Sequence, residues 1–307
     1  MSDSTEALKL GNSKKLALQP MRFTDILDGI FNLYRDHFKL FFSIAVVYHI
    51  SRFGRELLDA FFFYGSNSPK ILLLDAATSF TEYFVGCFVL GALVYARMQA
   101  YLGRPITARA AFRQVRRRIR PCCYGWFFLF FIIVVLTVLI FRFFGSRSGG
   151  SMAAILVTSL LAVYFIIRWR FYGMSILFEE TTARNALRRS SELVKGTWWR
   201  VFGISVAIYL LGLMVMSVLL VCWGIVLLLT GVTESASILR MVARILSPSV
   251  NEVGWLSCIL QNLIVVSIST FSTLPIWGIG FTLLYFDLRI RKEGFDIEMM
   301  VSNRSVE

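Results

Sequence analysis

The sequence predicts an all-α, polytopic integral membrane protein with about six transmembrane helices and further amphipathic helices at the membrane interface. Of its 307 residues, 57% are hydrophobic and only 17% are charged, and the mean hydropathy is +0.67. Soluble domains are much less apolar than this. Several apolar runs also reach the length of about 20 residues that a helix needs to cross a bilayer. Composition and run length together exclude an ordinary soluble protein.

Six segments have the length and composition of transmembrane helices. Residues 124–144 and 201–230 are apolar almost throughout. Residues 151–167 end before Arg168 and Arg170, whose side chains we expect to extend to the membrane interface. The three other segments are residues 38–64, 71–99 and 254–286.

The last of these segments is too long for one straight crossing. It contains Pro275, which removes a helical hydrogen bond and bends the helix. We therefore expect a bent helix, or two half-helices that meet near this proline.

Charged residues interrupt two of the predicted spans. In the segment 38–64 four of them have the spacing i, i+3, i+4 and i+7, which places them on one stripe of a helix. Two acidic residues of the segment 71–99 are seven positions apart and share a face. Because charge in hydrocarbon is costly, we expect either a polar cavity within the bundle or ion pairs at the outer interface. The six residues are Arg52, Arg55, Glu56, Asp59, Asp75 and Glu82.

Most of the 32 Lys and Arg residues fall in the N-terminal stretch, in residues 97–120, in residues 168–200 and after the last span. Cytoplasmic loops of membrane proteins collect such residues, so we expect both termini in the cytoplasm. These loops also explain the net charge of +13, and we expect no binding of nucleic acid.

Residues 109–120 (RAAFRQVRRRIR) lie between Pro105 and Pro121 and predict a basic interfacial helix. We expect its apolar residues to face the membrane while its arginines reach the phosphates of anionic lipids. The alternative is a loop that only fixes the topology and has no specific ligand. The apolar residues are Ala110, Phe112, Val115 and Ile119. The arginines are Arg109, Arg113, Arg116, Arg117, Arg118 and Arg120.

Two stretches of the chain begin alike, with TARAAFR from Thr107 and TARNALR from Thr182, and a looser copy begins at Thr24. In each copy the threonine is at the position of a helix N-cap. The pattern predicts three units of one interfacial helix and one hairpin of spans; chance similarity is the alternative. The units would cover residues 24–101, 107–178 and 182–290, in a single membrane domain of residues 21–298 between flexible cytoplasmic tails, residues 1–20 and 299–307.

The C-terminal motif, residues 285–298 (YFDLRIRKEGFDIE), interlaces acids and bases at helical spacing. Asp287 with Arg291 and Arg289 with Glu293 are i, i+4 pairs, and Gly294 is in a plausible position to end the helix. We expect these residues to fix the end of the last helix at the cytoplasmic rim.

This motif, residues 186–200 (ALRRSSELVKGTWWR) and residues 26–35 (ILDGIFNLYR) followed by Phe38 resemble the membrane domain attached to some bacterial glycerophosphoryl diester phosphodiesterases. That domain more often stands alone, and the resemblance covers residues 21–297. It implies a helical module of the bacterial cytoplasmic (inner) membrane with no assigned chemistry. The phosphodiesterase activity of the fused members belongs to a separate metal-dependent barrel, for which we find no room or ligands here.

From these observations we expect a non-enzymatic accessory or scaffold protein that acts through anionic lipids or a membrane-protein partner. We expect no cofactor, no metal and no catalytic residue. The alternative is a transporter or lipid-translocating protein that uses the charged cavity and the break at Pro275. With only two histidines in the chain and no visible pair of nucleophile and base, an enzyme is the third interpretation.

Overall fold

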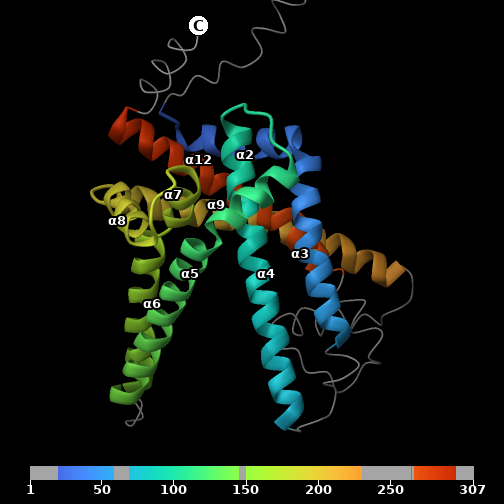
Figure 1. The fold of residues 1–307 in the computed structure, drawn as a ribbon, viewed down its shortest axis with the longest axis vertical. Coiled ribbons are helices and arrows are strands. Elements are labelled where there is room, and N and C mark those ends of the chain that lie inside the picture. The colour runs from blue at the N-terminus through green and yellow to red at the C-terminus, as the bar shows by residue number, and fades with distance from the viewer. Residues whose placement is uncertain (1–19, 59–68, 145–149, 230–263, 265, 295–307) are drawn as a thin grey trace, which may run out of the picture.

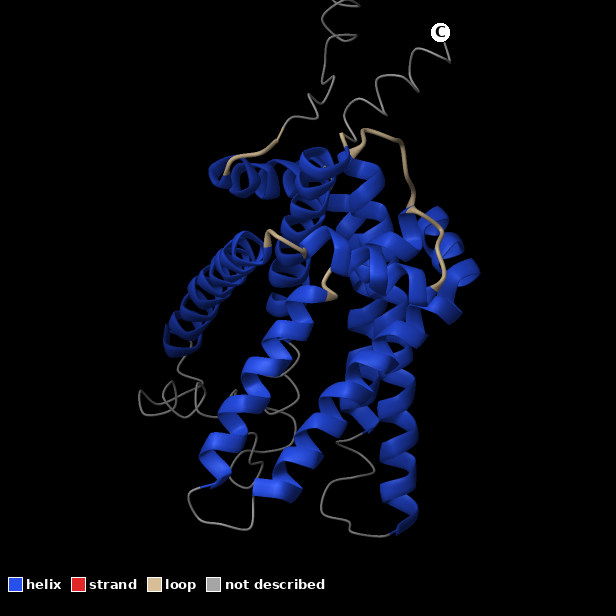
Figure 2. Cartoon of the chain, turned by 90° about the vertical axis from the view of Figure 1, so that its left-hand side faces the viewer, coloured by secondary structure: helices blue, strands red, loops and turns tan. Residues whose placement is uncertain are grey.

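The computed structural model of the protein describes residues 20–58, 69–144, 150–229, 264 and 266–294. Within these residues every regular element is a helix, and short loops connect them (Figure 2). The predicted all-α class is thus confirmed. The predicted tails, residues 1–20 and 299–307, lie outside the described residues except for Pro20.

The described helices include two long pairs that extend from one side of the remaining helices. They are α2 (Phe23–Asp36), α3 (Phe38–Leu58), α4 (Pro69–Tyr101), α5 (Ala108–Phe144), α6 (Gly150–Arg168), α7 (Tyr172–Phe178), α8 (Ala183–Val194), α9 (Trp198–Leu229), the π-helical turn η2 (Ser269–Thr273) and α12 (Leu274–Glu293). In Figure 1 the pairs α3 with α4 and α5 with α6 point downward, and both ends of the described chain lie at the top.

Four helical segments are long and apolar enough to cross a membrane, which indicates a membrane-embedded protein. They are Ala77–Tyr101, Ser159–Phe178, Trp198–Val226 and Val266–Glu293. They overlap four of the six predicted spans. The two others are residues 38–64, of which 38–58 form α3 and the rest lie outside the described residues, and residues 124–144, which lie in α5. Neither is among these four. In α3 the charges that interrupt the apolar run distinguish it from the four.

Helix α12 forms the centre of the protein. Pro275, Ile276 and every residue from 279 to 290 are buried, and the helix contacts α2, α4, α8 and α9. On α2, Ile26 and Ile30 are fully buried. A methyl group at Gly29 would lie 2.9 Å from Leu283 Cδ1, so the glycine lets α2 approach α12 closely. Helix α2 therefore packs on the protein through one apolar stripe, as amphipathic helices do.

At the break expected near Pro275 the described helix continues without a gap, and its geometry changes from π-helical to α-helical. The π-helical turn Ser269–Thr273 ends directly before α12, and Pro275 lies in the first turn of that helix. Proline has no N–H to donate to the carbonyl four residues earlier, which is that of Phe271. The Tyr34 hydroxyl on α2 donates to this oxygen instead, at 2.6 Å. The π-helical turn is thus stabilised by a side chain from another helix.

The three threonines expected to be N-caps differ in the structure. Thr107 precedes α5, and its hydroxyl oxygen accepts from the Ala110 N–H at 3.3 Å. Thr182 has the N-cap position of α8 without a side-chain bond. Thr24 is wrong as an N-cap because it lies inside α2, whose N-cap is Arg22. The first two copies also bury the equivalent alanine, Ala111 and Ala186 respectively.

Candidate functional site: charged groups along the bundle

Glu82 on α4 joins two arginines of α3. Arg52 Nη1 lies 2.9 Å from Glu82 Oε1, and Arg55 Nη1 lies 3.2 Å from Glu82 Oε2. Arg55 also donates to the Ser79 hydroxyl at 2.6 Å. The Glu82 side chain is only 12% exposed, so one buried carboxylate serves two guanidinium groups. These contacts hold α3 against α4.

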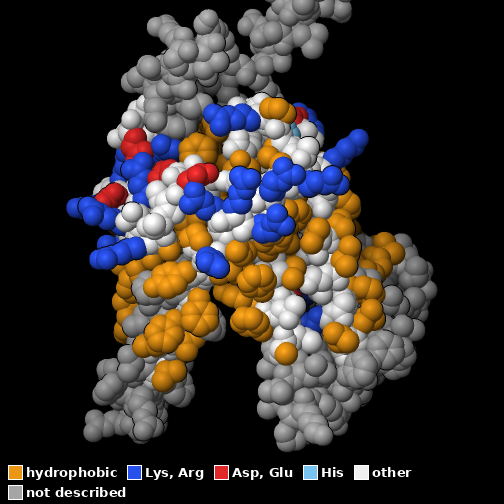
Figure 3. All heavy atoms as spheres, in the orientation of Figure 1, with side chains coloured by type: hydrophobic (Ala, Val, Ile, Leu, Met, Phe, Trp, Pro, Cys, Tyr) orange, Lys and Arg blue, Asp and Glu red, His pale blue; other side chains and the backbone are white. Residues whose placement is uncertain are grey.

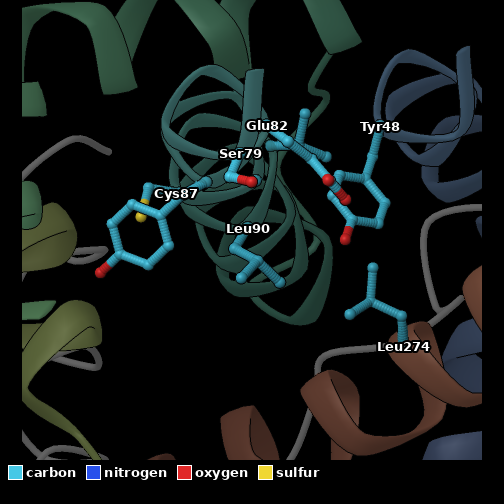
Figure 4. Close-up of a pocket in the computed structure, with 9 residues that line it drawn as sticks. Tyr48, Ser79, Glu82, Cys87, Leu90 and Leu274 are labelled. Carbon is cyan, nitrogen blue, oxygen red and sulfur yellow. The ribbon is translucent and has the colours of Figure 1, made fainter. Parts of the chain in front are cut away.

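A pocket of about 330 Å³ begins at this carboxylate. Its wall is mostly apolar, and Figure 4 shows Glu82 extending from α4 towards Tyr48 of α3, with Leu274 reaching the same space from α12. The structure therefore shows ion pairs with a mostly apolar pocket beside them, and the choice between a polar cavity and ion pairs at the outer interface stays a prediction. The residues around the pocket are Tyr48, Ser79, Glu82, Tyr83, Gly86, Cys87, Val89, Leu90 and Leu274.

Three of the six residues predicted for this cluster cannot be compared with it. Glu56 and Asp75 lie on α3 and α4, but their side chains lie outside the described part of the structure, and Asp59 lies outside it altogether. Only Arg52, Arg55 and Glu82 are brought together by described contacts.

The predicted basic helix is the first third of α5. The helix continues past Pro121, with a non-helical residue at Arg118 (φ −116°, ψ 16°). The proline ring displaces the carbonyl four residues earlier and so explains a kink at this point. The kink divides α5 into a basic part and an apolar part, as the sequence predicts, but without a loop between them.

The apolar side of this basic part packs on protein, which corrects the expectation that it faces the membrane. Val115 is fully buried, and a methyl group at Gly91 of α4 would lie 3.0 Å from its Cγ1. The Phe112 ring stacks on Phe88 of α4 at 5.3 Å between centroids. The small Gly91 lets the two helices approach, and this contact with α4 removes the apolar stripe from lipid.

The arginines on the opposite side are directed outward. Lys and Arg side chains form a band across the upper half of the molecule, above a region of hydrophobic side chains (Figure 3). Five of the six predicted arginines are exposed, and they are Arg109, Arg113, Arg116, Arg117 and Arg120.

The sixth arginine, Arg118, is ion-paired. Its Nη2 lies 2.6 Å from Glu180 Oε2, and Gln114 donates to the other carboxylate oxygen at 3.1 Å. These two hydrogen bonds lower the pKa of Glu180 below its ordinary value, and the bond from Gln114 contributes more than the bond from Arg118. Arg118 therefore fixes the loop between α7 and α8 to α5.

The predicted C-terminal pairs are both present, and the first belongs to a larger buried site. Asp287 is fully buried and accepts from Arg291 Nε at 2.9 Å, from Arg200 Nη2 at 2.9 Å and from the Met21 N–H at 2.8 Å. Arg200 and Arg291 also donate to the Met21 carbonyl. One carboxylate thus ties α12 to the start of α9 and to the residue that leads into α2.

The second pair belongs to a network around Glu179. Arg289 Nε lies 3.1 Å from Glu293 and 3.8 Å from Glu179, and Arg189 of α8 bridges the same two acids at 2.7 and 3.2 Å. The Tyr285 hydroxyl donates to Glu179 at 2.8 Å. Gly294 ends α12 in the left-handed conformation, with φ 63°. These contacts make the motif a point of attachment for α7 and α8.

Sequence reasoning did not find the pair Arg97 and Arg170. Arg97 was expected in a cytoplasmic stretch, but it is only 2% exposed and donates from Nε to the Leu93 carbonyl at 2.8 Å. Arg170 is half-buried, and its guanidinium lies 3.5 Å from the centroid of the Phe281 ring. Both arginines line a second pocket, of about 170 Å³. The feature of the sequence that could have indicated this site is Arg97 itself, a charged residue within the apolar run of α4.

Comparison with known proteins gave no match: no protein family, no curated protein and no solved structure is significantly similar to this chain. The resemblance to the phosphodiesterase membrane domain therefore stays a prediction that rests on the quoted motifs.

Proposed function

We propose that the protein is a non-enzymatic, multi-pass protein of the bacterial inner membrane that acts as an accessory or scaffold module by binding anionic lipid headgroups. In this proposal the membrane domain has six spans and belongs to the resembled family. Both termini and the basic band are cytoplasmic. A membrane-protein partner is a second binding partner of the same surface.

The exposed arginine side of α5 is the observation that carries the proposal. Five arginines within about three helical turns are exposed, while the opposite side of the same helix is fixed on α4. Each such cation near a bilayer surface contributes about 1 kcal/mol of attraction to anionic lipids. The band of Lys and Arg lies directly above the hydrophobic region of the surface (Figure 3). Lipid headgroups would lie at the level of this band.

The test is the lipid preference of the reconstituted protein. Spin-labelled phosphatidylglycerol and phosphatidylcholine are compared for the fraction that the protein immobilises in vesicles, at low and high salt. We expect a preference for phosphatidylglycerol that weakens at high salt, because salt screens exposed charges.

The control for this test replaces the five exposed arginines with glutamine. This variant should lose the preference while keeping its thermal stability, since none of the five contributes to the described core. Equal immobilisation of the two lipids by the original protein would reject the proposal.

The pocket beside Glu82 favours a second candidate function, the translocation of a lipid or solute. It shares Cys87, Leu90 and Leu274 with the pocket of Arg97 and Arg170, so the two adjoin along α4. Dithionite quenching of fluorescent phosphatidylglycerol in proteoliposomes tests this candidate. A rate above that of protein-free vesicles, lost in Glu82→Gln, would favour translocation over the scaffold.

A further inference from the structure

We propose that the pocket between Arg97 and Arg170 binds a phosphate group, supplied by an anionic phospholipid whose apolar part lies along α4. The inference rests on the proposed function insofar as the ligand is a membrane lipid. It differs in naming one buried site with a fixed stoichiometry instead of an exposed surface.

Two cations from different parts of the chain meet at this pocket. Arg97 lies on α4, one turn before its end at Tyr101, and Arg170 lies in the turn between α6 and α7. Their guanidinium groups border the same space of about 170 Å³, whose other walls come mainly from apolar residues of α4, α7 and α12. This volume is below that of pockets for drug-sized ligands, about 300 to 1,000 Å³, and suits one phosphate with the atoms next to it.

The charge of this pair is not balanced by the surrounding described residues. Arg97 donates to two backbone carbonyls, those of Leu93 and Leu274, and Arg170 lies over the rings of Phe281 and Tyr209. In the described part of the chain no Asp or Glu forms an ion pair with either arginine. Arg97 is buried and Arg170 is half-buried. Charges removed from water are normally paired because their desolvation is costly. An anion in the pocket would supply the missing charge.

The surrounding residues hold both guanidinium groups in place. A methyl group at Gly278 of α12 would overlap Arg97 Nη1, so this glycine leaves the space that the guanidinium occupies. Two of the five N–H donors of Arg97 bind carbonyls, and the others remain for a ligand. Phe281, which lies on α12 like Gly278, holds the guanidinium of Arg170 by a cation–π contact. Two fixed guanidinium groups are the donors that phosphate oxygens prefer.

The position of the pocket favours a lipid as the source of the phosphate. Arg97 lies near the end of α4 on the side of the basic band, while Glu82 lies 15 residues earlier, about 22 Å along the helix. The space between them is bordered by Cys87, Leu90 and Leu274, which line both pockets. A phospholipid with its phosphate at the arginines would find apolar walls along α4 for its chains.

The binding experiment uses the full chain in detergent and native mass spectrometry. Phosphatidylglycerol, phosphatidylcholine and inorganic phosphate are titrated separately. We expect one phosphatidylglycerol per chain that survives mild activation and high salt, because a buried site is screened less than a surface. Retention of inorganic phosphate alone would assign the site to a free anion. Retention of neither phosphate-bearing anion would overturn the proposal.

Variants then locate the bound molecule. Arg97→Gln and Arg170→Gln should each weaken the retained lipid roughly tenfold, the effect of one charged hydrogen bond. Gly278→Ala should do the same without removing a charge, because it displaces Arg97. Gly203→Ala is the matched control, since a methyl group there has no neighbour within 4 Å. Unchanged retention in all three pocket variants would overturn the proposal.

A cross-linking measurement on the original protein does not depend on whether these variants fold. A photoreactive phosphatidylglycerol should label the pocket wall, including Met174 and Leu177 of α7. Labelling confined to the exposed arginines of α5 would overturn the buried site and leave the proposed function intact. Equal immobilisation of the two spin-labelled lipids by the original protein, together with labelling of the pocket, would instead overturn the proposed function and leave the buried site intact, so the two failures can be distinguished.

Discussion

The C-terminal network and the Arg97 pocket are built from the same residue types at the same end of the bundle, but only one of them contains acid. Around Asp287, Arg200 and Arg291 are matched by a fully buried carboxylate and the backbone of Met21. Around Arg97, backbone carbonyls and aromatic rings replace the carboxylate. The first arrangement is complete in itself and fixes three helices. The second retains two positive charges, and this difference separates a structural site from a candidate binding site.

The largest effect is expected for Asp287→Asn. The substitution removes the charge that balances Arg200 and Arg291, and the loss of one partner of a buried ion pair costs about 3 to 5 kcal/mol. We expect a large fall in the thermal unfolding temperature in detergent, or failure to recover folded protein. Asp25→Asn is the matched control, because its carboxylate is exposed and, within the described residues, accepts from the Arg22 N–H alone. Equal effects of the two substitutions would contradict the assignment.

The next largest effect on stability is expected for Glu82→Gln. The change keeps the shape of the side chain but removes the negative charge shared by Arg52 and Arg55, at a cost of about 1 to 3 kcal/mol. Thermal unfolding measures this cost. In Glu192→Gln the lost pair with Arg188 is exposed, so the change should stay within about 0.5 kcal/mol. If the two variants are equally stable, Glu82 does not hold α3 against α4.

Tyr34→Phe tests the π-helical turn. Without the hydroxyl the Phe271 carbonyl loses its hydrogen bond, and we expect a loss of about 1 kcal/mol. Hydrogen exchange should also rise in η2 and the first turn of α12, measured by mass spectrometry. Tyr164→Phe removes a hydroxyl bound only to the exposed Arg168 and should change neither quantity. Unaltered exchange around Pro275 in the Tyr34 variant would show that the π-helical turn does not depend on α2.

The smallest effect concerns pH. The pKa of Glu180 is lowered in the folded protein, so its ion pair with Arg118 stabilises the fold above the ordinary glutamate pKa of 4.5. That contribution is lost as the pH falls through the lowered folded-state value. Arg118→Gln should therefore reduce the unfolding temperature slightly at pH 7 and not at the acidic end of a pH series. Arg113→Gln is the control, and a pH-independent difference would argue against the pairing.

The sequence predicted local features well because they depend on spacing within one helix. The pairs of Asp287 with Arg291 and of Arg289 with Glu293 follow from i, i+4 geometry, and Pro275 indicated where the helix becomes irregular. Helix type and apolar length likewise depend on composition. These features are properties of a single segment, so no knowledge of packing is needed to find them.

Features that depend on packing between helices were not predictable. Nothing in the sequence near Val115 indicates that this side chain packs against Gly91 of α4. From the sequence alone we therefore expect the apolar side of this helix to face lipid. Arg170 lies against Phe281, more than a hundred residues later, and nothing in the sequence around Arg170 indicates this contact. Burial of an arginine is decided by the distant residues that surround it, and a glycine such as Gly278 gains its role only beside Arg97.

The contact of Met21 with Asp287 joins positions 266 residues apart and bears on how the protein is made. During synthesis α2 leaves the ribosome first among the described helices, and α12, on which it packs, leaves last. Until α12 is inserted, the stripe of Ile26 and Ile30 has no protein surface to cover it, and an amphipathic helix in that state rests on the membrane surface. Docking of α2 on α12 can therefore only follow the synthesis of α12, and a chain interrupted before Asp287 leaves α2 without the surface on which it packs.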